Sequence, residues 1–319
     1  HQGNRSNFSM QRNKIMAKIP IIISLDVHTH VYQDKLNEVP VWIEKTLRVL
    51  DDISIKSSFF FPAECAEQMP REVRMILDEG HEIGCHSLTH KPDEQYNTMP
   101  FDNQKNKLSE AKKRIEEVTM KEIVSFRAPV FRLNGNTIRA LDEVGFKIDS
   151  SVCPQRLGIF SSDITNIGWL FAPRKPYHPS YDSPFTRGNA LLWEVPVSSF
   201  IVPFMANVGM AFGRMIEKLF FKFLHIESTM FNNPIVYLFH PEDLEENRET
   251  LQYKLHWNHL LPSKSHGFKV RYALYNRNHN PKKTSENIIS LLKTIKNQNN
   301  INFLTCEQMI PLLENKREQ

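Results

Sequence analysis

Hydrophobic positions along the chain follow two periods in turn, and the alternation predicts strands and helices. Residues 18–26 are apolar and β-branched, which is typical of a strand buried on both faces. Residues 38–51 instead place apolar side chains among charges at helical spacing. The pattern continues with short apolar segments at 53–62, 81–86, 122–129 and 146–151 and with helical segments at 69–80, 102–118 and 136–145. Strands that alternate with helices of this length predict βα units and a parallel sheet or barrel.

The alternation stops over residues 153–190, which are rich in proline, glycine, serine and asparagine. This composition predicts a long irregular insertion. Regular elements return as strands at 191–200 and 235–240, a helix at 285–298 and a strand that runs into a helix at 301–313. Since no repeat and no clear linker occurs, we expect one catalytic domain over 18–319, with an irregular insertion near 153–235.

Composition narrows the classes of function. The chain has 319 residues, of which 40% are hydrophobic, and a formal net charge of +4. The hydrophobic content is sufficient for a substantial core. The charge excess is too small for a dedicated nucleic-acid binder and suits weak attraction to anionic lipid or to phosphate-bearing substrates. We therefore expect no nucleic-acid partner.

The cysteines and the beginning of the sequence bear on the compartment. Cys65, Cys85, Cys153 and Cys306 are far apart, so we expect free buried thiols and a reducing environment. Residues 1–17 are polar, and we expect a disordered lead-in or a cloning remnant. No run of about eighteen apolar residues, the length that a spanning helix needs, occurs. These features favour work in the cytoplasm, with membrane association left open.

An acid and two histidines follow the first predicted strand. Asp26, His28 and His30, in the stretch "SLDVHTH", share one face because strand side chains alternate. The carboxyl end of a barrel strand is where active sites are built. One acid with neutral imidazoles suits a divalent transition metal, most often zinc. The alternative is that these residues cap the strand and bond to loop backbone.

A second histidine pair follows the strand at 81–86. His86 and His90, in "EGHEIGCHSLTH", are four residues apart, so on a helical turn they can hold one ion. Such pairs also occur on ordinary surfaces. The preceding strand and the first cluster favour the metal interpretation. His81 lacks such a partner, and we expect it to face solvent at a helix end.

Three further residues lie at strand ends. Arg127 would hold a nearby carboxylate ionised and fixed in direction, although a surface arginine is an equal alternative. Asp149 and His240 each end another strand. Histidine is a natural general acid because its pKa lies near neutrality. A single histidine of this kind is more often structural, so the argument depends on several such residues converging.

The first cluster resembles the "DxHxH" strand of metal-dependent amidohydrolases and PHP-type phosphoesterases. No later "HTD"-like or "SDxH"-like element follows, so this resemblance is confined to "SLDVHTH". Over most of residues 18–313 the chain is instead similar to the polysaccharide deacetylase family, also called the NodB homology domain or carbohydrate esterase family 4. "GHEIGCHSLTH" resembles the second motif of that family, whose two histidines bind metal and correspond to His86 and His90.

Other motifs support the same resemblance. "FRAPVF" is similar to the third motif, whose arginine, here Arg127, orients the catalytic aspartate. "LFHPE" is similar to the fifth motif, whose histidine, here His240, is the general acid. Asp149 stands where the aspartate of the fourth motif tunes that histidine, and this match is looser.

The first motif departs from the pattern of the family. Most members read T-F-D-D-G and one branch reads D-x-D, where the first Asp is the base and the second binds metal. Here Asp26 fits the base, while His28 stands in the place of the metal-binding Asp. The resemblance thus implies a zinc ion, or another divalent transition metal, held by His28, His86 and His90, with His30 as an alternative ligand.

The resemblance implies an α/β fold, a distorted (β/α) barrel of seven strands. It also implies a metal-dependent hydrolase that removes an acetyl group from an N-acetylated sugar or a surface-polysaccharide precursor. Two alternatives stay open: a related barrel hydrolase acting on a formyl group or a cyclic amide, and a catalytically weak carbohydrate-binding relative.

Two basic segments bear on the carrier of the substrate. Residues 200–226 are apolar and aromatic, with Arg214, Lys218 and Lys222 at four-residue spacing. We favour a helix packed on the barrel with a charged outer face over a helix in a membrane interface. The basic residues of 264–283 are more typical of a solvated face than of a site for a nucleotide or lipid phosphate.

Overall fold

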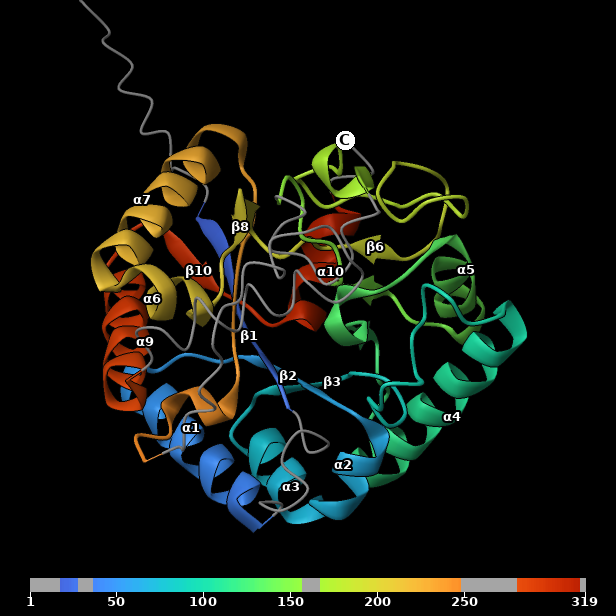
Figure 1. Ribbon diagram of the computed structural model, residues 1–319, viewed down its shortest axis with the longest axis horizontal. Helices are drawn as coiled ribbons and strands as arrows, with labels where there is room; N and C mark the ends of the chain where they lie inside the picture. The colour runs from blue at the N-terminus through green and yellow to red at the C-terminus, as the bar shows by residue number, and fades with distance from the viewer. Residues whose placement is uncertain (1–17, 28–36, 157–166, 248–279, 316–319) are drawn as a thin grey trace, which may run out of the picture.

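A curled parallel sheet with helices around it forms the fold (Figure 1). The computed structural model describes residues 18–27, 37–156, 167–247 and 280–315. Within these ranges the sheet has eight strands: β1 (Ile19–Asp26), β2 (Ser58–Phe61), β3 (Glu82–Cys85), β4 (Ser125–Phe126), β5 (Ile148–Asp149), β6 (Trp193–Glu194), β9 (Ile235–Phe239) and β10 (Ile301–Phe303).

Seven of these strands form one continuous run in the order β9, β1, β2, β3, β4, β5, β6. The eighth, β10, pairs with the first residues of β1 (Ile19–Ile21), and β2 pairs with the last (Ser24–Asp26). Every pair in this sheet is parallel. The structure therefore confirms the expected (β/α) barrel with seven main strands.

The two ends of the run approach each other without forming a regular ladder. The backbone N–H of Ser198, just after β6, donates to the carbonyl of Val236 in β9 over 3.2 Å. The Ser198 hydroxyl accepts from the N–H of Val236 over 3.0 Å. The short antiparallel strands β7 (Ser199–Phe200) and β8 (Val202–Pro203) follow directly. This interrupted closure is what makes the barrel distorted.

The helices form an outer ring around the strands (Figure 1). They are α1 (Val39–Ile53), α2 (Ala63–Gln68), α3 (Pro70–Asp78), α4 (Phe101–Thr119), α5 (Gly135–Val144), α6 (Ala206–Phe212), α7 (Arg214–Phe231), α9 (Pro281–Lys296) and α10 (Cys306–Glu314). Short 3-10 turns lie at η2 (Pro129–Phe131), η4 (Ile167–Leu170) and η5 (Pro241–Leu244). No helix in the described ranges is long and apolar enough to cross a membrane.

Most predicted elements are present, and local chemistry sets their ends. In α5, the side chain of Asn134 accepts from the N–H of Thr137 as an N-cap, and Gly145 ends the helix at φ 88°. All eight residues of β1 are buried, as its continuous apolarity predicts. The strand predicted at 53–62 is shorter in the structure. The helix α1 continues to Ile53, and β2 covers only Ser58–Phe61.

The part of the predicted insertion that the structure describes is irregular at first but not throughout, because α6 and α7 lie within its expected range of 153–235. The described residues from 167 to 190 contain only η4 and isolated bridges, and regular structure returns at β6. The predicted strand at 191–200 is reduced to the two residues of β6 and the two of β7. The single domain over 18–319 remains a prediction, and the lead-in expected over residues 1–17 lies outside the described residues.

One expectation about the core is wrong. His81 is only 4% exposed and does not face solvent. Its Nδ1 accepts from the backbone N–H of Ser57 over 3.0 Å, and its ring meets Phe59 edge to face. Burial is the largest influence on the His81 pKa and lowers it to about 4. His81 is a neutral side chain that links α3 to β2. The four cysteines are buried thiols that form no disulfide in the described structure, as expected.

Candidate active site

A buried ion pair joins the ends of β1 and β4. Arg127 directly follows β4, and its Nη1 donates to Oδ1 of Asp26 at the end of β1 over 2.8 Å. Arg127 is fully buried and Asp26 is 4% exposed. The two residues are a hundred positions apart in the chain, and the curl of the sheet brings their strand ends together. The structure therefore favours a fixed carboxylate partner for Arg127 over a surface position.

The guanidinium of Arg127 is held on several sides. Its Nε donates to the carbonyl of Ser150 over 2.8 Å, and its Nη2 donates to the Ser150 hydroxyl over 2.9 Å. Its Nη1 also donates to the hydroxyl of Ser24 over 3.0 Å. The guanidinium lies 4.3 Å from the centre of the Phe60 ring. The planar guanidinium, held by these contacts, leaves the Asp26 carboxylate little freedom to reorient.

Asp26 carries a negative charge in this environment. Burial alone would raise the pKa of its carboxyl group. The charges of Arg127 and His240, together with the hydrogen bond from Arg127, outweigh burial and hold the pKa below its usual value. An ionised carboxylate at a strand end is available to accept a proton.

His86 directly follows β3 and faces the same carboxylate. Its Nδ1 lies 2.8 Å from the carbonyl oxygen of Arg127. Because a carbonyl only accepts, Nδ1 carries the proton and Nε2 carries the lone pair. Nε2 lies 4.0 Å from Oδ2 of Asp26. Burial lowers the pKa of His86 despite the opposing influence of Asp26. His86 is thus a neutral imidazole with its lone pair toward the site.

His90 lies beside His86, although a helical turn does not place it there. The two ring centres are 4.7 Å apart, and residues 86–90 form a loop. Ser87 and His90 have left-handed backbone angles, with φ of 81° and 60°. The carboxylate of Glu94 accepts from the backbone N–H groups of residues 88, 89 and 90 over 3.0, 2.7 and 2.9 Å. The expected helical turn is wrong because Glu94 holds these amides in a loop.

The side chains of His86 and His90 are of a type that binds zinc, but the described residues do not form a complete zinc site. Two imidazoles lie beside a carboxylate, and His86 has the fixed tautomer that is common among metal ligands. Within the described residues, no group of three His, Cys, Asp or Glu side chains is placed to hold a metal ion. His28, the expected third ligand, and His30, its alternative, lie outside the described residues.

His240 directly follows β9, and Asp243 holds it. The backbone N–H of His240 donates to Oδ2 of Asp243 over 2.9 Å, and its Nδ1 lies 3.2 Å from the same oxygen. Burial lowers the pKa of His240, but the Asp243 carboxylate, with smaller contributions from Glu242 and Asp26, raises it to about 9. The ring is therefore protonated at neutral pH and can give up a proton.

Asp243 was not singled out from the sequence, although a signal for it exists. In "HPED" the aspartate comes three residues after the histidine, with a proline that starts a helical turn. At this spacing the aspartate side chain can reach back to the backbone N–H of the histidine, as Asp243 does to His240.

Asp149 has a different neighbourhood from the one expected. It ends β5, fully buried, and accepts a hydrogen bond from the Ser151 hydroxyl. That hydroxyl accepts in turn from the backbone N–H of Ala128, the residue after Arg127. Asp149 also shares a hydrogen bond with Glu194, and burial raises the pKa of both carboxyl groups. The carboxylate that the structure places against His240 is Asp243, whereas Asp149 supports the segment that carries Arg127.

The sequence of the first half of the chain matches a known family. Residues 25–148 match the sequence profile of the polysaccharide deacetylase family. A peptidoglycan deacetylase-like protein, FGM2, from Gibberella zeae is 32% identical over 114 residues, which are 35% of this chain and 33% of that protein. A peptidoglycan deacetylase from Helicobacter pylori is 27% identical over 112 residues, 35% of this chain and 37% of that protein. The chain thus aligns with about a third of the length of these curated relatives.

Solved structures share the fold over nearly the whole chain. A Mycobacterium smegmatis protein described as a polysaccharide deacetylase aligns with a TM-score of 0.62 at 15% identity, over 95% of this chain and 92% of that one. The allantoinase PuuE aligns with a TM-score of 0.60 at 13% identity, over 95% of this chain and 93% of that one. At these identities the likeness shows the fold alone.

Proposed function

Residues 25–148 belong to the polysaccharide deacetylase family, and from this premise we propose that the protein removes acetyl groups from an N-acetylated sugar in a metal-dependent hydrolysis. The observation that carries the proposal is the arrangement around Asp26. A buried ionised carboxylate is fixed by Arg127, with a neutral His86 at 4.0 Å and a charged His240 acting on it electrostatically. A base, an acid and imidazole ligands are what amide hydrolysis requires.

His86 and His90 are the described residues that would hold the metal, with His28 or His30 as the third ligand. A divalent metal bound there supplies Lewis-acid activation of the acetyl carbonyl and of the attacking water. Because the carbonyl of Arg127 fixes the tautomer of His86, Nε2 is the atom that would bind.

Asp26 is the general base in this proposal. Arg127 occupies Oδ1 of Asp26, while Oδ2 is the oxygen nearer His86. Oδ2 is therefore the atom that takes a proton from the attacking water. The charge of Arg127 keeps the carboxylate ionised before the reaction, and the fixed geometry avoids the cost of orienting it.

His240 is the general acid. An amine leaves poorly as an anion, so the nitrogen of the sugar must receive a proton as the C–N bond breaks. His240 is protonated at neutral pH because Asp243 raises its pKa to about 9. The products are acetate and an amino sugar.

The identity of the sugar is part of the proposal. The similar curated proteins are named for peptidoglycan, which favours an N-acetylated glycan or its precursor. A nucleotide or lipid carrier on that precursor stays open, because residues 264–283, whose basic side chains suggested a phosphate handle, lie outside the described residues. Work in the cytoplasm remains a prediction from the sequence.

Product analysis tests the reaction class. We expect the zinc-loaded protein to release acetate from N-acetylglucosamine oligomers and a chelator to abolish that release, with activity restored by added zinc. Release of formate from a formylated sugar, without acetate, would favour a deformylase. Opening of a cyclic amide would favour the chemistry of the allantoinase that shares the fold. Metal binding with no product from any acyl sugar would leave a carbohydrate-binding protein and overturn the proposed activity.

A further inference from the structure

The outward face of α7 is apolar. Six large side chains along it are exposed: Met215, Ile216, Leu219, Phe223, Ile226 and Met230. After the adjacent first pair their spacing is three or four residues, so they form one stripe. Met215 and Met230, near its two ends, are 77% and 70% exposed. The helix lies at the outer edge of the molecule (Figure 1). The helix packs on the barrel as favoured, and its outer face is mainly apolar rather than charged, although Arg214 and Lys222 are also exposed.

The opposite face of α7 packs on the barrel. Its buried residues are Glu217, Phe221, Leu224 and Ser228, also three or four apart. Glu217 accepts from the Tyr237 hydroxyl of β9 over 2.9 Å. The contacts that hold α7 on the barrel thus use a different stripe from the exposed one. The outer stripe has no role in the core of the described structure.

The β7–β8 hairpin extends the apolar surface. The ring of Phe200 lies 4.9 Å from the ring of Phe223, and Phe200 is itself 43% exposed. Next to it, Ile201 is exposed with φ at 65°. A left-handed backbone is unfavourable for a β-branched residue. Phe200 and Ile201 together present two large apolar side chains to solvent at the hairpin.

Basic residues line one side of the stripe. Arg214, Lys218 and Lys222 follow each other at four-residue intervals along α7. In the described part of the chain no ion pair joins any of them to a carboxylate. The two acids of α7 are engaged elsewhere, Glu217 with Tyr237 and Glu227 with Arg174. The flank therefore carries uncompensated positive charge.

We propose that the exposed stripe of α7 and the tip of the β7–β8 hairpin form a docking surface for an anionic lipid bilayer. A helix with an apolar stripe and a basic flank lies in the plane of a membrane interface, with its apolar side chains among the acyl chains. Each lysine or arginine near a negatively charged surface adds to the attraction. Charge complementarity favours this occupant over a second copy, because an antiparallel pair of α7 helices would bring both basic flanks to the same side.

The docking surface is independent of the acid and base residues and goes beyond the proposed hydrolysis. It is nevertheless tied to the candidate site. The bond from Tyr237 to Glu217 holds α7 against β9, the strand that directly precedes His240. A docked protein would therefore work next to the membrane surface.

Vesicle sedimentation with the full chain tests the proposal without any sugar substrate, so its outcome does not depend on the proposed activity. We expect binding to phosphatidylcholine vesicles that contain phosphatidylglycerol, with salt weakening it, and at least about tenfold weaker binding to phosphatidylcholine alone. Leu219→Ser/Phe223→Ser removes part of the stripe, and Lys218→Glu/Lys222→Glu reverses the flank. Each should weaken binding about tenfold or more, and circular dichroism verifies that each variant is folded.

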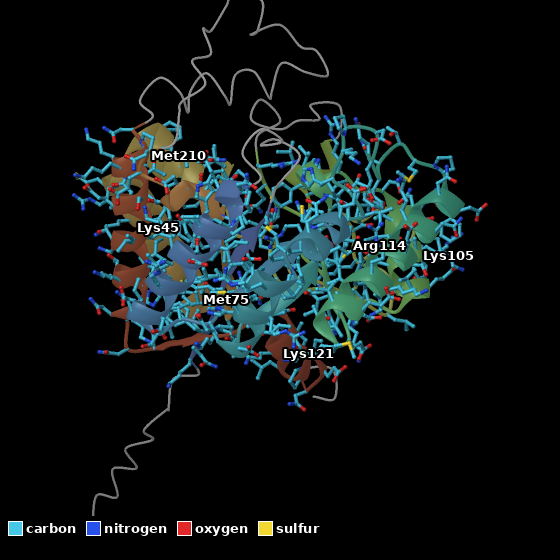
Figure 2. The ribbon with its side chains drawn as sticks, turned by 90° about the horizontal axis from the view of Figure 1, so that it is seen from below. Lys45, Met75, Lys105, Arg114, Lys121 and Met210 are labelled. Atoms are coloured by element: carbon cyan, nitrogen blue, oxygen red, sulfur yellow. The ribbon has the colours of Figure 1, made fainter. Side chains whose placement is uncertain are left out.

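A matched charge reversal is available on another part of the surface. Lys113→Glu/Lys121→Glu changes two exposed lysines, one within α4 and one just after it, and Figure 2 shows Lys121 far from Met210 of α6, which packs on α7. This variant should bind anionic vesicles far better than the α7 variant. Equal loss in both variants, or no binding by the unmodified chain, would overturn the proposal. A dimer in sedimentation velocity that Leu219→Ser/Phe223→Ser dissociates would instead show that the stripe joins two copies.

Discussion

At the scale of single residues, Arg127 organises two parts of the candidate site at once. Its guanidinium fixes Asp26, and its backbone carbonyl sets the tautomer of His86. Ser150 and the Phe60 ring hold the guanidinium in turn. Arg127 is therefore placed to position both the proposed base and a proposed metal ligand, and we expect this role to depend on its planar guanidinium more than on charge alone.

Arg127→Lys tests that role. The lysine keeps the positive charge but cannot reach Asp26 and Ser150 together, so Asp26 loses its fixed orientation. We expect kcat to fall about 10²-fold with a much smaller change in KM. Acetate-release kinetics on the zinc-loaded variant measure both constants, and circular dichroism verifies folding. A lysine variant with the original kcat would show that charge alone suffices at this position.

The pairing of His240 with Asp243 makes a prediction about pH. The carboxylate raises the pKa of His240 to about 9, so removing the charge lowers it. Because a general acid works in its protonated form, activity falls at high pH, and Asp243→Asn should move that high-pH limb to lower pH by about one to two units. The pH profile of kcat/KM is the measurement.

Asp149→Asn is the comparison for this profile, because the family motif assigned the tuning role to Asp149. The structure instead connects Asp149 with Ser151 and Glu194. We therefore expect the high-pH limb of Asp149→Asn to stay in place. A shift in this variant and none in Asp243→Asn would reverse the two assignments.

At the scale of elements, the sequence predicts the strands and helices better than the loops that hold the side chains. The periods of apolar residues predict β1, α3 and α5, since burial on a strand or along one helix face leaves a mark in the pattern. Spacing alone cannot distinguish a helical turn from a loop. The loop at 86–90 depends on Glu94, whose partners are three backbone amides that leave no trace in residue types.

Gly84 in β3 shows how closely the central strands pack. A Cβ at this position would lie 2.5 Å from the Ser125 hydroxyl and 2.7 Å from the Phe60 ring. Gly84→Ala should therefore lower the free energy of unfolding by about 2–3 kcal/mol, measured by chemical denaturation. It should also disturb His86, two residues later.

Gly145→Ala is the matched control for Gly84→Ala. A Cβ there meets no atom within 4 Å, and its only cost is a left-handed backbone at φ 88°. We expect about 1 kcal/mol of destabilisation for this change. If both variants lose the same free energy of unfolding, close packing is not the reason that β3 has a glycine at position 84.

At the scale of the whole molecule, the curl of the sheet is what assembles the candidate site. Asp26, Arg127 and His240 come from strands far apart in the sequence, and parallel strands bring their carboxyl ends to one edge. The sequence could predict this convergence because each residue follows an apolar segment. The prediction missed the carboxylate that meets His240, although the spacing of Asp243 three residues later is a local signal for it.

The orientation of α7 is a second feature that only the structure provides. Apolar side chains occur on both faces of this helix, and the buried face also carries Glu217 and Ser228, so hydrophobic periodicity cannot tell the buried stripe from the exposed one. The position of Glu217 against Tyr237 decides it. Which stripe of α7 is available for binding therefore follows from the folded structure and not from composition.

The most direct test of the central claim is the rate of acetate release from N-acetylglucosamine oligomers by zinc-loaded Asp26→Asn. Asparagine keeps the shape of the side chain but cannot accept the proton, so we predict a loss of about 10²-fold or more in kcat with zinc still bound. Asp52→Asn, at an exposed position in α1, should retain the original rate. An Asp26→Asn protein that binds zinc and releases acetate as fast as the unmodified chain would contradict the assignment of Asp26 as the base.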